Sequence, residues 1–118
     1  MRVYILANKG NDQIITCISQ IKHVNEIKVF DDNIRFIEQL SKRPPDCCLI
    51  KLGESQIPGL TTAEKIKRLN SEIRIILIAE DGDYALEGFE IGVQGYLLYP
   101  LEVEKLEQHF KDVRQESR

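Results

Sequence analysis

The sequence predicts an α/β fold in which a parallel five-stranded sheet carries helices on both faces. Short apolar segments alternate five times with segments whose apolar residues recur every three or four positions. Strands that alternate with helices along a chain form a parallel sheet through right-handed crossovers. The pattern fills residues 1–118 without an internal repeat, so we expect a single domain, with a polar end at 113–118 that could begin a linker.

Five segments are short, apolar and bounded by turn residues or prolines, which predicts strands. They lie at residues 2–7, 26–30, 46–52, 73–79 and 96–99. The third and fourth are almost entirely apolar, which favours the middle of the sheet, where both faces of a strand are buried. Pro100 ends the fifth segment.

Helical periodicity follows each of the five strands. The second helix begins at Asp31-Asp32, which we expect to cap it, and ends before Pro44-Pro45, which cannot continue a helix. The third and fourth helices are expected at about 61–70 and 83–91. Ile34, Ile37 and Leu40 are expected along one face of the second helix, with Phe36 beside that face. Residues expected to face the core from the third and fourth helices are Ala63, Ile66, Leu69, Ala85, Leu86 and Phe89. The last helix carries Val103, Leu106, Phe110 and Val113 at steps of three and four.

Composition excludes several classes of function. The formal charge of −3 provides no electrostatic surface for nucleic acid. No apolar run approaches the roughly 20 residues of a membrane span, and the first residues do not follow the layout of a signal peptide, so we expect a cytoplasmic protein. The three cysteines, Cys17, Cys47 and Cys48, lack the spacing of a metal site and are expected to fill the core. No metal and no cofactor is predicted.

Several stretches resemble the receiver domain of bacterial response regulators. Residues 45–52, followed by Gly59, resemble the third strand and subsequent loop of that family, and residues 74–78 resemble its fourth strand. Residues 84–91 and 95–100 are similar to the fourth helix and fifth strand of receivers that precede LytTR-type DNA-binding domains. The resemblance implies a (βα)5, flavodoxin-like three-layer sandwich with the sheet order 2-1-3-4-5.

The resemblance also implies a site for phosphoryl transfer. Typical receivers are phosphorylated on an aspartate at the end of the third strand; two acidic residues hold Mg²⁺, and a hydroxyl and a lysine contact the phosphoryl group. The matching positions here are Ala7 and Asn8 for the acids, Lys51 for the acceptor, Ala79 for the hydroxyl and Tyr99 for the lysine. An ammonium group cannot form an acyl phosphate, and it repels Mg²⁺. We therefore expect a degenerate receiver that is not an enzyme.

Three interpretations of Lys51 stay open from the sequence. Its ammonium group could point into solvent at the edge of the sheet, with its stem over apolar neighbours. It could have a partner that locks the pocket in one state. The candidates for that partner are Asn8, Glu54, Glu80 and Asp81. Lys51 and Asn8 could instead form a site for an anion or a small ligand.

Tyr96 matches a receiver aromatic residue whose rotation reports the state of the pocket to the face formed by helix four, strand five and helix five. The charged residues expected on this face are Glu87, Glu90, Lys105 and Lys111. Gly88 lies within the fourth helix and costs roughly 1 kcal/mol relative to alanine, so we expect that helix to be the most mobile.

These features predict a phosphorylation-independent module for signalling or transcription regulation. We expect it to act through protein–protein interaction, as a homodimer or with a protein partner. DNA would be contacted only through an effector domain that this chain lacks. The alternative function is a sensor that binds a small ligand or an anion in the vacated acceptor pocket.

Overall fold

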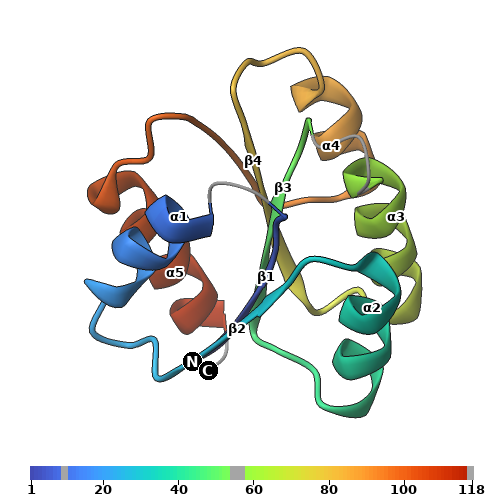
Figure 1. Ribbon diagram of the computed structural model, residues 1–118, viewed down its shortest axis with the longest axis horizontal. Helices are drawn as coiled ribbons and strands as arrows, with labels where there is room; N and C mark the ends of the chain where they lie inside the picture. Colours follow the sequence, from blue (N-terminus) through green and yellow to red (C-terminus); the bar gives the residue numbers. More distant parts are fainter. Residues whose placement is uncertain (9–10, 54–57, 117–118) are drawn as a thin grey trace.

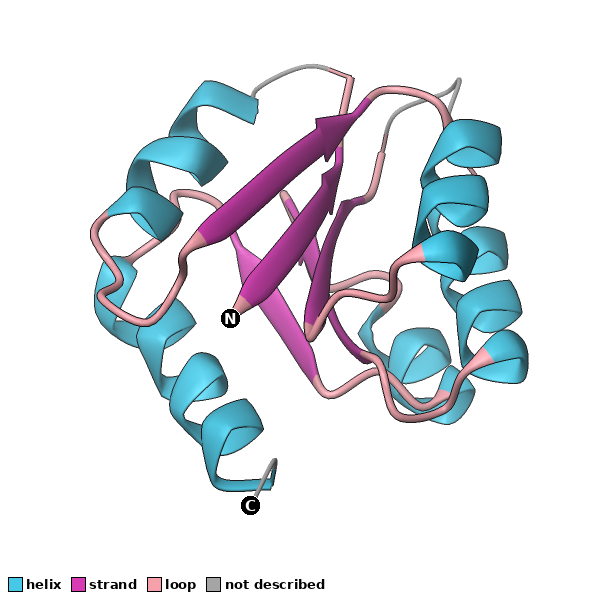
Figure 2. Cartoon of the chain, turned by 90° about the horizontal axis from the view of Figure 1, so that it is seen from below, coloured by secondary structure: helices cyan, strands magenta, loops and turns pink. Residues whose placement is uncertain are grey.

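The computed structural model describes residues 1–8, 11–53 and 58–116, with side chains through Phe110. Five parallel strands form one sheet in the order β2-β1-β3-β4-β5, which confirms the predicted topology. Helices α1 and α5 cover one face of the sheet, and α2, α3 and α4 cover the other (Figure 1). Figure 2, turned by 90°, shows the same two helical layers on either side of the twisted strands.

The elements alternate without exception along the chain. The strands are β1 (Arg2–Leu6), β2 (Glu26–Phe30), β3 (Cys47–Lys51), β4 (Arg74–Ala79) and β5 (Gly95–Leu98). The helices are α1 (Asn11–Ser19), α2 (Asn33–Lys42), α3 (Gly59–Leu69), α4 (Ala85–Ile91) and α5 (Val103–Glu116). Within the described part of the chain, no helix has both the length and the apolar run that crossing a bilayer requires.

Helix α2 begins where the sequence predicts it. The Asp32 carboxylate accepts hydrogen bonds from the backbone N–H groups of Ile34, at 2.7 Å, and Arg35, at 3.4 Å. It therefore satisfies two of the donors that have no partner within the first turn of a helix. Helix α3 begins two residues earlier than expected, because the Thr62 N–H donates to the Pro58 carbonyl at 2.9 Å.

Two hydrophobic cores lie on opposite faces of the sheet. The α2–α4 core is formed by Tyr4, Leu6, Phe36, Leu40, Cys48, Ile50, Leu52, Ala63, Ile66, Ile73, Ile75, Leu77, Ala79 and Val93. The α1/α5 core is formed by Val3, Ile5, Ala7, Ile14, Cys17, Ile18, Ile21, Cys47, Leu49, Ile76, Ile78, Leu97, Leu106 and Phe110. Because alternate residues of β3 enter different cores, this strand is buried on both faces, as its composition predicts.

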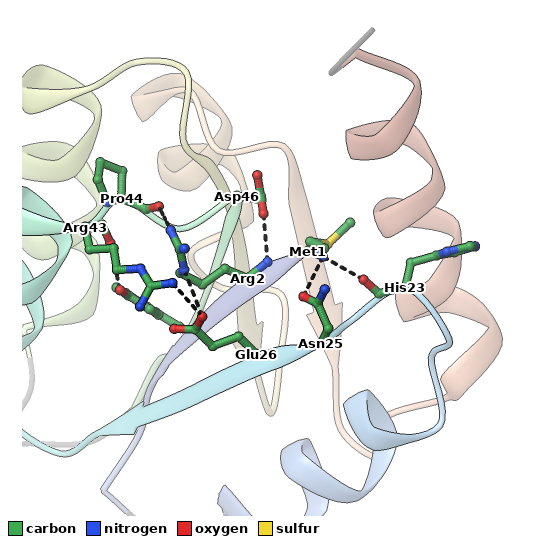
Figure 3. Close-up of polar contacts among 9 residues, drawn as sticks. Met1, Arg2, His23, Asn25, Glu26, Arg43, Pro44 and Asp46 are labelled. Carbon is green, nitrogen blue, oxygen red and sulfur yellow. Dashed lines mark hydrogen bonds and ion pairs between the residues drawn. The ribbon is translucent and has the colours of Figure 1, made fainter.

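Charged groups join the strands at the amino end of the sheet (Figure 3). Glu26 on the edge strand β2 forms ion pairs with Arg2 at 3.3 Å and with Arg43 at 3.2 Å. The Arg2 backbone N–H donates to the Asp46 carboxylate at 2.7 Å, and the Tyr4 hydroxyl donates to the Arg43 carbonyl at 2.7 Å. These contacts fasten β2 and the segment before β3 to β1, at the end of the sheet opposite the predicted site.

Four residues predicted to face the core are exposed instead: Ile34, Leu69, Leu86 and Phe89. Helix α2 buries Phe36 and Leu40, which are one turn apart, and Ile34 therefore lies on the other side of the helix. Helix α4 approaches the sheet through Gly88, where a Cβ atom would lie 2.8 Å from Leu77 Cδ1. The side chains that flank this glycine are consequently directed away from the core.

The packing of Gly88 predicts that Gly88→Ala destabilises the domain by about 1 kcal/mol or more. The methyl group would overpack against the fully buried Leu77, and such strain outweighs the gain in helix propensity of about 1 kcal/mol. Gly82→Ala is the matched control, because a Cβ atom there meets nothing within 4 Å. Urea denaturation of both variants tests the prediction, and equal stabilities would contradict it.

The buried thiols predict that stability falls under alkaline conditions. Burial raises the pKa of Cys47 from 9.0 to about 12 and raises the pKa of Cys48 well above 9.0. Above about pH 9 the unfolded thiols therefore release protons that the folded thiols keep, and each costs about 1.4 kcal/mol of unfolding free energy per pH unit. Cys47→Ala should lose less stability than the wild type between about pH 8 and pH 10, and an identical loss would contradict this account.

Candidate functional site

The positions chosen from the sequence meet at the carboxyl edge of the sheet. Strand register places Leu6 opposite Ile50, Lys51 opposite Ile78, and Ala79 opposite Leu98. Ala7 and Asn8 follow β1 directly, and Tyr99 follows β5. In open α/β sheets, binding sites form outside this edge, at the point where the strand order reverses. Here that point lies between β1 and β3.

The side chains of these residues divide between the two faces of the sheet. Ala7 is fully buried in the α1/α5 core, whereas Ala79 is buried in the α2–α4 core. Lys51 is two residues after Leu49 and Tyr99 is two residues after Leu97, so both share the face of Ala7. Asn8 is exposed. The sequence could identify the edge on which these residues gather, but not the face to which each side chain points.

Lys51 is half-buried, and its ammonium nitrogen lies 5.7 Å from the centroid of the Tyr99 ring. This distance is within the range of a cation–π interaction. The sequence named only polar and acidic partners, and the aromatic neighbour was missed because β4 separates the two strands. Glu80 and Asp81 line the same cavity as Lys51, and Glu54 lies outside the described residues.

A cavity of about 170 Å³ adjoins Lys51. Its described lining consists of Lys51, Leu52, Gly53, Ala79, Glu80, Asp81 and Tyr84. At the positions that the resemblance assigns to the phosphoryl acceptor and the acidic pair, the side chains are an ammonium, a methyl and an amide group, which do not fit Mg²⁺. Elsewhere in the described ranges, no cluster of three or more histidine, cysteine or acidic residues could hold a metal ion.

Tyr96 faces α4, on the opposite side of the sheet from Tyr99. Its hydroxyl group donates to the Asp81 carbonyl at 2.8 Å, and its ring packs against the α2–α4 core. Burial raises the pKa of the Tyr96 phenol, and the nearby Asp81 carboxylate adds to the increase. The contact connects β5 to the loop that follows β4, so a movement of this ring requires a new partner for its hydroxyl group.

The charged residues predicted for the α4–β5–α5 surface are exposed where the structure describes them. Glu87 and Glu90 lie on α4. Lys105 lies on α5 and forms an ion pair with Glu102 at 3.5 Å. The side chain of Lys111 lies outside the described part of the chain. Because the Lys105–Glu102 pair is exposed, it contributes little to stability.

Four exposed apolar residues that the sequence did not predict to be exposed lie on α4, on β5 and directly before α4. We define the α4–β5 patch as Tyr84, Leu86, Phe89 and Leu98, whose relative exposures are 45%, 73%, 52% and 48%. The patch accounts for four of the seven large apolar residues that are exposed among those described. For Leu86 and Phe89, the signal in the sequence is Gly88, because α4 approaches the sheet through this glycine.

Comparison with known proteins gives a consistent family. The family model described as "Response regulator receiver domain" matches residues 8–111. The chain is 23% identical over 99 residues to the Sensory transduction protein LytT of Enterococcus faecalis, covering 84% of this chain and 41% of that protein. It is 22% identical over 120 aligned positions to LytT of Bacillus subtilis, covering 100% of this chain and 50% of that protein. The chain thus spans half or less of these relatives.

Solved structures agree with this fold. The response regulatory domain of mrkE from Klebsiella pneumoniae superposes with a TM-score of 0.83 at 19% identity, covering 98% of this chain and 96% of that one. The isolated REC domain of RcsB from Salmonella enterica serovar Typhimurium, in the presence of BeF3-, gives 0.80 at 22% identity, covering 98% and 88%. The family match and the 2-1-3-4-5 sheet together show that this chain belongs to the response regulator receiver domain family.

Proposed function

We propose that this receiver domain works without phosphorylation, as a cytoplasmic protein-interaction module in signalling or transcription regulation. The observation that carries the proposal is the ammonium group of Lys51 at the carboxyl end of β3, where the family places its acceptor. An amine at this position offers no carboxylate oxygen for a phosphoryl group. Its charge also opposes the divalent cation on which phosphoryl transfer depends.

The other positions support the same conclusion. The methyl group of Ala7 cannot bind a metal ion, and because Ala7 is buried, solvent cannot take its place as a ligand. Asn8 provides an amide group where the family has a carboxylate. Ala79 has no hydroxyl group, and Tyr99 has no charge with which to contact phosphate. At each of these positions, the side chain that the family uses for metal binding or for contact with the phosphoryl group is therefore missing.

The α4–β5 patch is the surface that we propose for the interaction. Its four apolar side chains lie beside Glu87 and Glu90 on α4, and Lys105 lies on α5 across β5. Interfaces commonly place an apolar centre within a rim of charges. We propose a homodimer or another protein as the partner. Contact with DNA would require an effector domain, as the length of the LytT relatives suggests.

A second candidate function is a sensor of a small ligand. The observation that favours it is the cavity of about 170 Å³, whose lining includes a basic residue, Lys51, and two acidic residues, Glu80 and Asp81. The cavity is smaller than the roughly 300–1,000 Å³ of drug-sized ligand sites, so only a small polar molecule would fit. A ligand-dependent rise in thermal stability would favour this function over the interaction module.

Phosphodonor treatment tests the lack of phosphorylation. We expect no phosphoryl adduct on the wild-type domain after incubation with acetyl phosphate and Mg²⁺, because residue 51 is an amine. Intact-mass spectrometry measures the result, with a phosphorylatable receiver domain as the positive control. Lys51→Asp alone should not restore the reaction, since Ala7 and Asn8 still cannot hold the metal. A Mg²⁺-dependent adduct on the wild type would contradict the proposal.

Charge introduced into the patch tests the interaction surface. Leu86→Glu and Phe89→Glu should each weaken self-association roughly tenfold or more, because residues central to an interface commonly contribute about 2 kcal/mol. Ile34→Glu and Leu69→Glu are matched controls, since both residues are exposed and apolar but lie on α2 and α3. Sedimentation equilibrium measures the dissociation constants. A monomeric wild type at high concentration would exclude self-association, and equal effects of all four variants would exclude this surface.

A further inference from the structure

Lys51 and Tyr99 come from strands that are not neighbours in the sheet. Register places Lys51 opposite Ile78, and Ile78 opposite Leu97, so β4 lies between the two residues. Tyr99 is two positions beyond Leu97 and therefore shares the face of Lys51. The lysine stem thus extends across the end of β4, and the ammonium group reaches the ring at 5.7 Å. Backbone pairing alone does not require this contact.

The Tyr99 ring lies where β5 leads into α5. Its backbone N–H donates to the Ala79 carbonyl at 2.9 Å, which continues the β4–β5 ladder by one residue. Beyond it, Leu101 and Val103 pack against the α1/α5 core, as the Tyr99 side chain does. A force that holds this ring in place therefore also holds the segment from which α5 begins, three residues after Pro100.

We propose that Lys51 and Tyr99 form an internal clasp that holds the β5–α5 connection in one position. The inference rests on the proposed function: in a domain that works without phosphorylation, the clasp would fix the β5–α5 connection without a phosphoryl group. In the family, a lysine after the fifth strand contacts the phosphoryl group on the third. Here the cation is on the third strand and its partner is on the fifth, so the two strand ends are joined without an added group.

The clasp is suited to a permanent contact rather than a switch. The face of an aromatic ring attracts a cation without changing its own charge. Lys51 and Tyr99 are both half-buried, which reduces screening of the interaction by solvent. The segment that follows should therefore open rarely in the native state.

Hydrogen exchange measured by mass spectrometry tests the clasp, using the peptide that covers residues 97–106 of the full chain. Lys51→Met keeps the stem and removes the charge, whereas Lys51→Arg keeps a cation. Tyr99→Leu removes the ring, whereas Tyr99→Phe keeps it. We expect Lys51→Met and Tyr99→Leu to accelerate exchange roughly two- to thirty-fold, the range that cation–π energies give. Lys51→Arg and Tyr99→Phe should stay near the wild-type rate.

A double-mutant cycle isolates the pair, because Lys51 and Tyr99 both take part in other interactions as well. Combining Lys51→Met with Tyr99→Leu should accelerate exchange by less than the product of the two single effects, because the shared contact can be lost only once. Additive effects, or wild-type exchange in both single variants, would overturn the clasp. Intact mass after phosphodonor treatment is measured on the same samples. If the exchange data contradict the clasp while the wild type stays unphosphorylated, the proposed function is unaffected. A phosphoryl adduct on the wild type would contradict the proposed function directly.

Discussion

Lys51 is the last residue of β3, the central strand of the sheet, and its positive charge determines which groups can lie next to it. Strand β3 is buried on both faces, so its last side chain leaves the core at the edge where receivers perform phosphoryl transfer. A cation there repels Mg²⁺ and attracts the electron-rich face of Tyr99, 5.7 Å away. We propose that this one charge both opposes the family's chemistry and joins the ends of two strands.

The two tyrosines of the β5 region, Tyr96 and Tyr99, make contacts on opposite faces of the sheet. Tyr96 points toward α4 and donates to the Asp81 carbonyl, whereas Tyr99 points toward α5 and contacts Lys51. Both helices of the proposed interaction surface are thus connected to the carboxyl edge through β5. The close approach of Gly88 to Leu77 turns Leu86 and Phe89 outward, which gives this surface its apolar centre.

The topology could be predicted from the sequence because each element carries a local signal. Alternation of strands and helices, the Asp32 cap and the prolines before β3 depend on neighbouring residues only. The orientation of α4 could not be predicted, because it depends on how closely Gly88 approaches a distant strand. The partner of Lys51 could not be predicted either, since Tyr99 reaches it across β4. Apolar periodicity identifies a helix, but it does not reveal which contacts a glycine permits.

The most direct test of the central claim is a crystal structure of the domain grown with Mg²⁺ and beryllofluoride. We predict that the Lys51 ammonium nitrogen will lie within about 6 Å of the Tyr99 ring, with neither a metal nor an adduct beside it. A metal ion with oxygen ligands at about 2.1 Å next to residue 51, or a beryllofluoride group at that position, would contradict the account.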